Sequence, residues 1–230
     1  MLPHTQTYTA TRDDVAQLQN RVLRNTYLLL AVSMVPTVLG ALIGVQMGFS
    51  FMQGSPMMGF LLFLGIAMAF MYGIEKTKET GMGVVLLLGF TFFMGLMLSN
   101  ILRAALGFSN GGMLIAMAAG GTGAIFFTLA GIASTTKRDF SGIGKFLFAG
   151  VILILVASLA NIFFHIPALA LAVSAIAVVI FSGYILYDIN RIVHGGETNY
   201  ISATLAVYLD VYNIFVNLLN ILMIFSGRRD

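Results

Sequence analysis

Two aspartates, Asp188 and Asp210, lie within long apolar stretches of the chain. Placing a carboxylate in a bilayer costs roughly 2.5–3.5 kcal/mol on insertion scales, so by default such a residue marks an ion path, a proton relay or a paired site. Two facing carboxyl groups in a low dielectric do not both ionise easily, and they titrate as one unit. With one shared proton the pair is a hydrogen-bonded clasp, and with none it is a doubly negative oxygen site that suits a hard cation such as calcium. The pair is therefore our candidate for pH sensing, for a cation pathway and for calcium binding.

The two aspartates are predicted to lie on neighbouring antiparallel helices. The helix of Asp188 should end near His194, with Gly195 as its C-terminal cap, and the next helix should begin near Asn199. At a rise of about 1.5 Å per residue, Asp188 lies about 9 Å and Asp210 about 16 Å from that end of the helices. Helix tilts of about 20° are usual and can absorb a difference of about 7 Å, so the spacing allows direct contact between the two carboxyl groups.

A row of asparagines continues from Asp210 along the same helix, at Asn213, Asn217 and Asn220. At about 100° per residue, these four side chains fall within one sector about 80° wide. A polar face cannot point at lipid, so this helix is predicted to lie at the centre of a bundle. The row has two interpretations: a polar pathway for ions, or hydrogen bonds that join neighbouring helices.

The elements that must position these residues are membrane spans. The chain has 230 residues, of which 59% are hydrophobic and 9% charged, and its mean hydropathy is +0.95. A soluble domain carries about 25% charged residues, so ordinary soluble folds and disordered chains are excluded. A transmembrane helix needs about 20 mostly apolar residues. Seven stretches meet this requirement, at 25–45, 56–74, 82–102, 112–133, 145–164, 167–190 and 202–225.

The predicted fold class is therefore an all-α membrane protein, a seven-transmembrane helix bundle with the last helix central. Residues 1–24 form an N-terminal segment and residues 25–230 the transmembrane domain. Val15, Leu18 and Val22 recur at helical spacing in the first segment. This pattern predicts a short amphipathic helix on the cytoplasmic membrane surface. Two interpretations of the segment stay open: a solvated N-terminal extension of the first helix, or a docking surface for a partner.

Basic residues set the orientation of the spans. With the N-terminus in the cytoplasm, nine of the twelve Lys and Arg residues lie on the cytoplasmic side and three outside. A last segment that re-entered instead of crossing would change this count to eleven against one, but 202–225 is long enough to cross. Because the basic residues occupy short loops between apolar runs, the predicted partner is the lipid bilayer and not a nucleic acid.

Several kinds of site are excluded by composition. The chain has no cysteine, which excludes disulfides and thiolate metal sites. Three scattered histidines cannot build a zinc centre. The last span has no lysine for a retinal Schiff base. We therefore expect no cofactor, apart from calcium as a bound or transported ion.

An intramembrane aspartyl protease is the sharpest enzymatic alternative. Tyr187-Asp188 fits the first motif of those enzymes, but the second motif requires Gly-x-Gly before its aspartate. Asp210 instead follows Val207-Tyr208-Leu209. We therefore expect that the protein is not an enzyme.

The block from Gly183 to Asn220 resembles the Bax inhibitor family (the transmembrane Bax inhibitor motif family), and within it the bacterial YccA-like members. The resemblance covers essentially the whole chain. Its motifs are Gly-Tyr-Ile-Leu-Tyr-Asp-Ile from residue 183, Ile-Val-His-Gly-Gly-Glu-Thr-Asn-Tyr from residue 192, Ala-Val-Tyr-Leu-Asp-Val-Tyr-Asn-Ile-Phe from residue 206, and Leu-Arg-Asn-Thr-Tyr from residue 23.

The resemblance implies a bundle in which six helices surround the last one, and a pH-sensitive calcium leak sensed by an aspartate pair that matches Asp188 and Asp210. It also implies a second function class, a non-conducting modulator of the membrane-anchored protease FtsH, in which the N-terminal segment matching residues 1–24 takes part. The implied location is the bacterial inner membrane. One departure is that some members carry an arginine in the second helix that latches one aspartate, whereas the span 56–74 has no basic residue.

Overall fold

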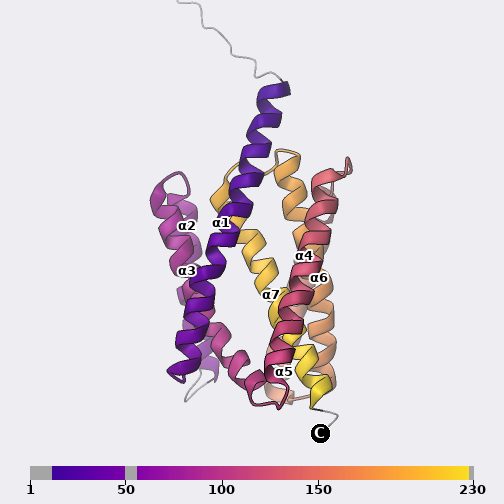
Figure 1. Ribbon diagram of the computed structural model, residues 1–230. Helices are drawn as coiled ribbons and strands as arrows, with labels where there is room; N and C mark the ends of the chain where they lie inside the picture. The colour runs from indigo at the N-terminus through magenta and orange to yellow at the C-terminus, as the bar shows by residue number, and fades with distance from the viewer. Residues whose placement is uncertain (1–11, 50–55, 228–230) are drawn as a thin grey trace, which may run out of the picture.

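Seven long helices form the bundle. The computed structural model describes residues 12–49 and 56–227, with the side chains of residues 12–15 and 56 left out of the description. Within these residues each helix is long and apolar enough to cross a membrane, and one 3-10 turn, η1 (Ser141–Ile143), precedes the fifth (Figure 1). The helices are α1 (Arg12–Gln46), α2 (Pro56–Thr77), α3 (Gly81–Leu106), α4 (Gly111–Thr135), α5 (Gly144–Phe164), α6 (Pro167–Val193) and α7 (Tyr200–Ser226). All seven predicted spans are confirmed, and each helix extends past its predicted limits at one or both ends.

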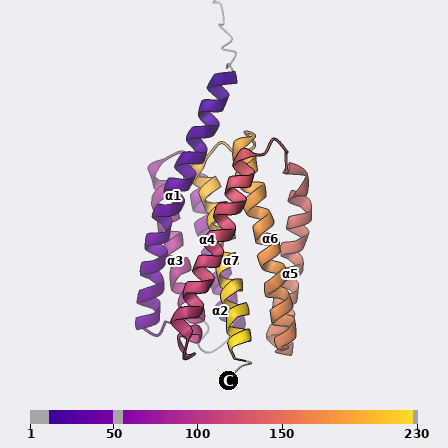
Figure 2. The same cartoon turned by 45° about the vertical axis from the view of Figure 1, so that its right-hand side comes forward.

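The first helix projects beyond the rest of the bundle (Figures 1 and 2). It is continuous for 35 residues from Arg12, so the predicted boundary between residues 24 and 25 falls inside it. No break separates the described part of the N-terminal segment from the first span, and its predicted role as a docking surface stays a prediction. Leu18 is 60% exposed on this extension. Residues 1–11 lie outside the described part of the chain.

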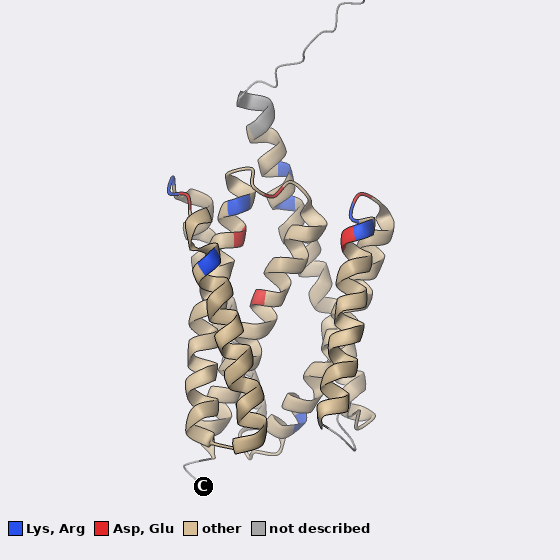
Figure 3. Ribbon diagram, turned by 180° about the vertical axis from the view of Figure 1, so that it is seen from behind, with Lys and Arg blue, Asp and Glu red and all other residues tan. Residues whose placement is uncertain are grey.

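Charged residues gather at the end of the bundle where α1 begins, which we call the N-terminal end (Figure 3). Among the Lys and Arg residues whose side chains the structure describes, all but Arg103 lie at this end. The last helix ends at the opposite end, so α7 crosses the bundle fully and does not re-enter. The cytoplasmic location of the N-terminal end stays a prediction from this distribution of basic residues.

The last helix is central, as its polar face predicts. From Ile201 to Ile224 none of its residues is exposed. It contacts every other membrane helix except α5, which packs against α6 and η1 at the outside of the bundle. The expectation of six helices around α7 therefore holds for five of them. The exception has a physical reason: α5 is apolar over most of its surface and buries only Leu147, so most of that surface can face lipid.

Two glycines bring α1 and α3 into backbone contact. A methyl group added at Gly95 would lie 2.1 Å from the carbonyl oxygen of Thr37, and one added at Gly40 would lie 2.2 Å from that of Phe92. Small residues that let backbones approach are the usual means of helix association in lipid, where the hydrophobic effect does not drive helices together. The close approach therefore fixes α1 against α3.

Buried hydroxyl groups of α1 are satisfied within the helix itself. Thr26 donates to the carbonyl oxygen of Val22 at 2.8 Å, and Ser33 donates to that of Leu29 at 2.8 Å. Thr37 donates to the carbonyl oxygen of Ser33 at 2.9 Å. The helix thus carries polar side chains into the core without leaving their donors unpaired.

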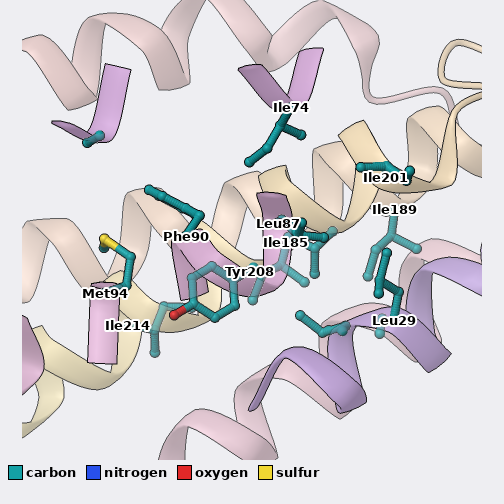
Figure 4. Close-up of a cluster of buried hydrophobic side chains, with 14 of the residues drawn as sticks. Leu29, Ile74, Leu87, Phe90, Met94, Ile185, Ile189, Ile201, Tyr208 and Ile214 are labelled. Carbon is teal, nitrogen blue, oxygen red and sulfur yellow. The ribbon is translucent and has the colours of Figure 1, made fainter. Parts of the chain in front are cut away.

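The core lies where α3, α6 and α7 meet, with side chains from α1 and α2 closing it. Figure 4 shows Phe90 and Leu87 beside Tyr208, with Ile185 close by. Tyr208 is fully buried, and its hydroxyl group lies 2.9 Å from Thr37 Oγ1. The apolar face of α7 packs into this core, so its polar face lies towards α6.

Candidate functional site

The α6–α7 hairpin holds the candidate site. Gly195 has a φ of +77°, a left-handed conformation that glycine adopts without strain and that ends α6 as predicted. The helix α7 begins beside Asn199 as predicted, and Asn199 caps it, because its Oδ1 accepts hydrogen bonds from the backbone N–H groups of Ile201 at 2.9 Å and Ser202 at 3.1 Å. Its Nδ2 donates to the carbonyl oxygen of Lys78 at 3.0 Å, which ties the hairpin to the α2–α3 connection.

The two carboxyl groups meet across this hairpin. The two carboxyl groups lie close enough to interact electrostatically, so the predicted depth difference is absorbed. A carboxylate carries no proton to donate, so a hydrogen bond between two carboxyl groups requires one shared proton. The Asp210 side chain lies in the core with 4% of its residue surface exposed, and its buried Oδ2 has no hydrogen-bond partner among the described residues. The Asp188 side chain is 12% exposed, on the N-terminal side of the pair.

Arg191 is the cation beside the pair. Its Nη1 lies 3.7 Å from Asp188 Oδ1, and its Nη2 lies 3.8 Å from Glu197 Oε2. These distances are those of ion pairs and exceed those of hydrogen bonds. The guanidinium carbon also lies 5.5 Å from the centre of the Tyr187 ring. One arginine is thus shared between a carboxyl group of the pair and a carboxylate of the following loop.

Hydrogen bonds to a side chain of α6 hold the connection between α4 and α5. Asn190, buried in α6, accepts from the backbone N–H of Phe140 at 2.9 Å and donates to the carbonyl oxygen of Arg138 at 2.9 Å. In the same loop, the backbone N–H of Ser141 donates to Asp139 at 2.8 Å and holds the pKa of that carboxyl group below its usual value. The loop is therefore held in place by side chains rather than by a helix or strand.

The three asparagines differ in what they bind. Asn213 and Asn217 each donate from Nδ2 to the carbonyl oxygen four residues earlier, at Leu209 and Asn213, both at 2.8 Å. Asn220 alone of the three donates across to another helix, to Ser174 Oγ of α6 at 2.8 Å. The interpretation as interhelical hydrogen bonds thus holds for Asn220. The other two amides keep their side-chain oxygens available on the polar face of α7.

A polar cavity of about 250 Å³ lies at the far end of this face, between α5, α6 and α7. Its polar wall is made by Ser158, Asn161, Ser174, Asn217 and Asn220. A space of this size with several polar partners can hold water. Asp210, Asn213 and this cavity follow one another along α7, towards the end of the bundle opposite Asp188.

Calcium takes six to eight oxygen ligands, and a carboxylate pair offers four. In the part of the chain with described side chains, no group of three or more His, Asp or Glu residues is arranged to hold a metal ion. A calcium ion at the predicted Asp188–Asp210 site would therefore need further oxygen ligands.

Sequence reasoning missed two parts of this site. The sequence indicates Arg191 only as one of the basic residues that flank the apolar stretches. Its position three residues after Asp188 nevertheless places both side chains on one face of a helix. The polar cavity was the second part, because one of its walls comes from α5. Ser158 and Asn161 of α5 form no sequence pattern that indicates a polar face. Asp188, Asp210, Asn213, Asn217 and Asn220 lie where the sequence predicted, on the facing surfaces of α6 and α7 or along α7.

Comparison with known proteins gives the wider relationship. The family described as Inhibitor of apoptosis-promoting Bax1 matches residues 19–227. The modulator of FtsH protease YccA from Escherichia coli K12 is 41% identical over 203 residues, which cover 88% of this chain and 90% of the relative. The inner membrane protein YccA of Escherichia coli O6:H1 matches equally well. A membrane protein of Vibrio cholerae serotype O1 is 38% identical over 209 residues, covering 91% of this chain and 92% of the relative.

Proposed function

The chain belongs to the Bax inhibitor-1 family, and from that membership we propose that it is a multi-pass inner-membrane protein in which the Asp188–Asp210 pair makes a calcium leak depend on pH. The observation that carries the proposal is the contact between the two carboxyl groups, one of them buried with an unpartnered oxygen. Neutral amides would join two helices at lower cost, so a purely structural pair is poorly explained.

The proposed pathway follows the polar face of α7. A cation enters beside Glu197 and Arg191 at the N-terminal end, passes the carboxyl pair, and continues along Asn213 to the polar cavity. Side-chain oxygens line each of these positions, which is what a hard cation requires.

The proton works as a switch because it changes the charge of the pair. With the shared proton in place, one hydrogen bond joins the carboxyl groups and one negative charge remains, facing Arg191. Without the proton, two negative charges repel in a low dielectric unless a cation compensates them. The two protonation states therefore differ both in the separation of α6 from α7 and in affinity for a cation.

The test is calcium flux into liposomes that contain the purified protein alone. We expect a flux that changes between about pH 5 and about pH 8, because the shared proton sets the charge of the pair. Empty liposomes and liposomes with heat-inactivated protein measure the background. A folded protein with no flux at any pH would contradict the leak and leave the pair structural.

Replacing Arg191 by Gln should shift the pH dependence without abolishing it. The guanidinium stabilises the ionised form of Asp188, so its loss should move the midpoint of the flux profile to higher pH, by roughly half a unit to one unit for a partly exposed pair. Lys145→Gln removes a charge from the same end of the bundle and serves as the control. An unchanged midpoint in Arg191→Gln would show that the arginine does not act on the pair.

A second candidate function is modulation of FtsH. It is favoured by the relative named for that activity and by the projecting extension of α1. The exposed Leu18 on this extension offers a partner an apolar contact. The two functions are separable, because a leak needs no partner and a modulator does.

A charge placed on the extension tests the second candidate. Leu18→Glu should weaken co-purification with FtsH roughly fivefold, the factor for an interface side chain that contributes about 1 kcal/mol. Asn20→Glu adds the same charge at an exposed polar position of the same segment and is the matched control. Equal losses in both variants would indicate a charge effect, and no loss in either would remove the extension as the docking surface.

A further inference from the structure

An apolar groove of about 760 Å³ runs between α1 and α4, with α7 as its floor. In the described chain no Cα atom of α1 lies within 8 Å of a Cα atom of α4, so side chains alone bridge the two helices. Small side chains keep the groove open on both walls. Its walls and floor include Ala31 and Met34 of α1, Ala119 and Gly123 of α4, and Val211 and Phe215 of α7.

The groove opens sideways, at the depth of the bilayer. Val38 on its α1 rim is 55% exposed and Phe127 on its α4 rim is 75% exposed, and both lie in membrane-spanning segments. Water does not fill an apolar space that faces hydrocarbon. If the groove were empty, the atoms that line it would lose their van der Waals contacts. The volume lies in the usual range of ligand sites, about 300–1,000 Å³.

The hydroxyl groups in the wall already have partners. Thr37 Oγ1 and Tyr208 Oη lie 2.9 Å apart, and Thr122 donates to a carbonyl oxygen of its own helix at 2.8 Å. Tyr212 donates to the carbonyl oxygen of Met94 at 3.2 Å. An occupant therefore needs no hydrogen-bonding groups inside the groove, which is the chemistry of a hydrocarbon chain.

The N-terminal end of the groove is polar, and basic residues stand next to its last lining residues along the chain. Tyr27 Oη and Ser134 Oγ lie 3.3 Å apart and join α1 to α4 there. Arg24 precedes Tyr27 by one turn on the same face of α1, while Lys137 and Arg138 follow the end of α4, and all three side chains are exposed. The neighbouring Asp139 is engaged with the backbone of Ser141, and no acidic residue lines the groove.

From the apolar groove and the basic residues next to its lining along the chain, we propose that this site binds one anionic phospholipid of the leaflet at the N-terminal end. An acyl chain lies between α1 and α4 over α7, and the phosphate lies between Arg24 and the Lys137-Arg138 pair. Packing holds the chain, since the hydrophobic effect does not favour a groove over the surrounding lipid. Basic residues at the membrane surface attract the anionic headgroup.

Retention of phosphatidylglycerol by the purified full-length protein tests the proposal. Native mass spectrometry of the detergent-solubilised protein should show one retained phosphatidylglycerol, and Gly123→Leu should lower its occupancy roughly tenfold by filling the groove. Gly120→Leu is the matched control: at both positions an added methyl group meets nothing within 4 Å, but Gly120 does not line the groove. Gly131→Leu, also in the lining with open space, replaces Gly123→Leu if that variant fails to fold.

The headgroup is tested separately. Arg24→Gln combined with Lys137→Gln should remove the preference for phosphatidylglycerol over phosphatidylcholine, whereas Lys145→Gln should keep it. Equal retention by the wild type of both lipids would overturn the anionic part of the proposal. No retained lipid in the wild type, or equal retention in Gly123→Leu and Gly120→Leu, would overturn the groove as the binding site. Each outcome is read without a flux measurement, so it is independent of the proposed leak.

Discussion

Liposomes that contain Asp210→Asn are expected to show a calcium flux that no longer changes with pH. Asparagine donates from Nδ2 the hydrogen bond that a protonated Asp210 would donate to Asp188, so the variant holds the pair in its shared-proton state at every pH. Its flux at about pH 8 should therefore equal that of the wild type at about pH 5. The comparison predicts the result without assuming which protonation state conducts.

Two further variants test whether the loss of pH dependence is specific to the carboxyl pair. Asp188→Asn should remove the pH dependence as well, because a coupled pair titrates as a unit. Asp139→Asn changes an exposed loop carboxyl at the same end of the bundle and should leave the profile unchanged. Wild-type pH dependence in both pair variants, with folding verified by size-exclusion chromatography, would separate the carboxyl pair from the pH response.

The second large effect is expected for stability. Gly95→Ala places a methyl group 2.1 Å from the carbonyl oxygen of Thr37, so α1 and α3 must separate. Because the obstacle is backbone and not a flexible side chain, we expect a loss of at least about 2 kcal/mol in the free energy of unfolding. Unfolding in detergent followed by circular dichroism measures it.

Gly120→Ala is the control for the stability experiment. An added methyl group there meets nothing within 4 Å, and alanine favours a helix over glycine by up to about 1 kcal/mol. The two substitutions are chemically identical and should have opposite signs. A stable Gly95→Ala variant would mean that the α1–α3 contact yields more easily than its backbone geometry implies.

Hydropathy and helix caps predicted most of the fold. The seven spans follow from apolar length, and Gly195 and Asn199 fix the α6–α7 turn by chemistry that does not depend on the rest of the bundle. The outer position of α5 could not be predicted. A segment that is apolar over most of its surface can pack against protein or face lipid, and its sequence does not distinguish the two. The groove between α1 and α4 also left no pattern, since it results from where two non-adjacent helices diverge.

The candidate site was predictable to the extent that it lies on one hairpin. Asp188 and Asp210 are placed by the rise of two helices and one short turn, so their contact follows from local geometry. The asparagines were placed on the correct face, but their partners were not predictable. An amide in a helix can bond its own backbone or a neighbour, and only the position of Ser174 distinguishes Asn220 from the other two.

The hydrogen bonds that α1 makes within itself matter during synthesis. Its main partner, α3, ends at Leu106, about 60 residues after α1 ends, so at roughly 5–20 residues per second α1 waits about 3–12 s for that partner. During this interval the faces that carry Thr26, Ser33 and Thr37 meet lipid or the insertion machinery. Each of these hydroxyl groups donates to a carbonyl oxygen of its own helix, so the nascent helix enters the bilayer with those donors satisfied. The sequence of α1 thus suits a helix that must exist alone before the bundle exists.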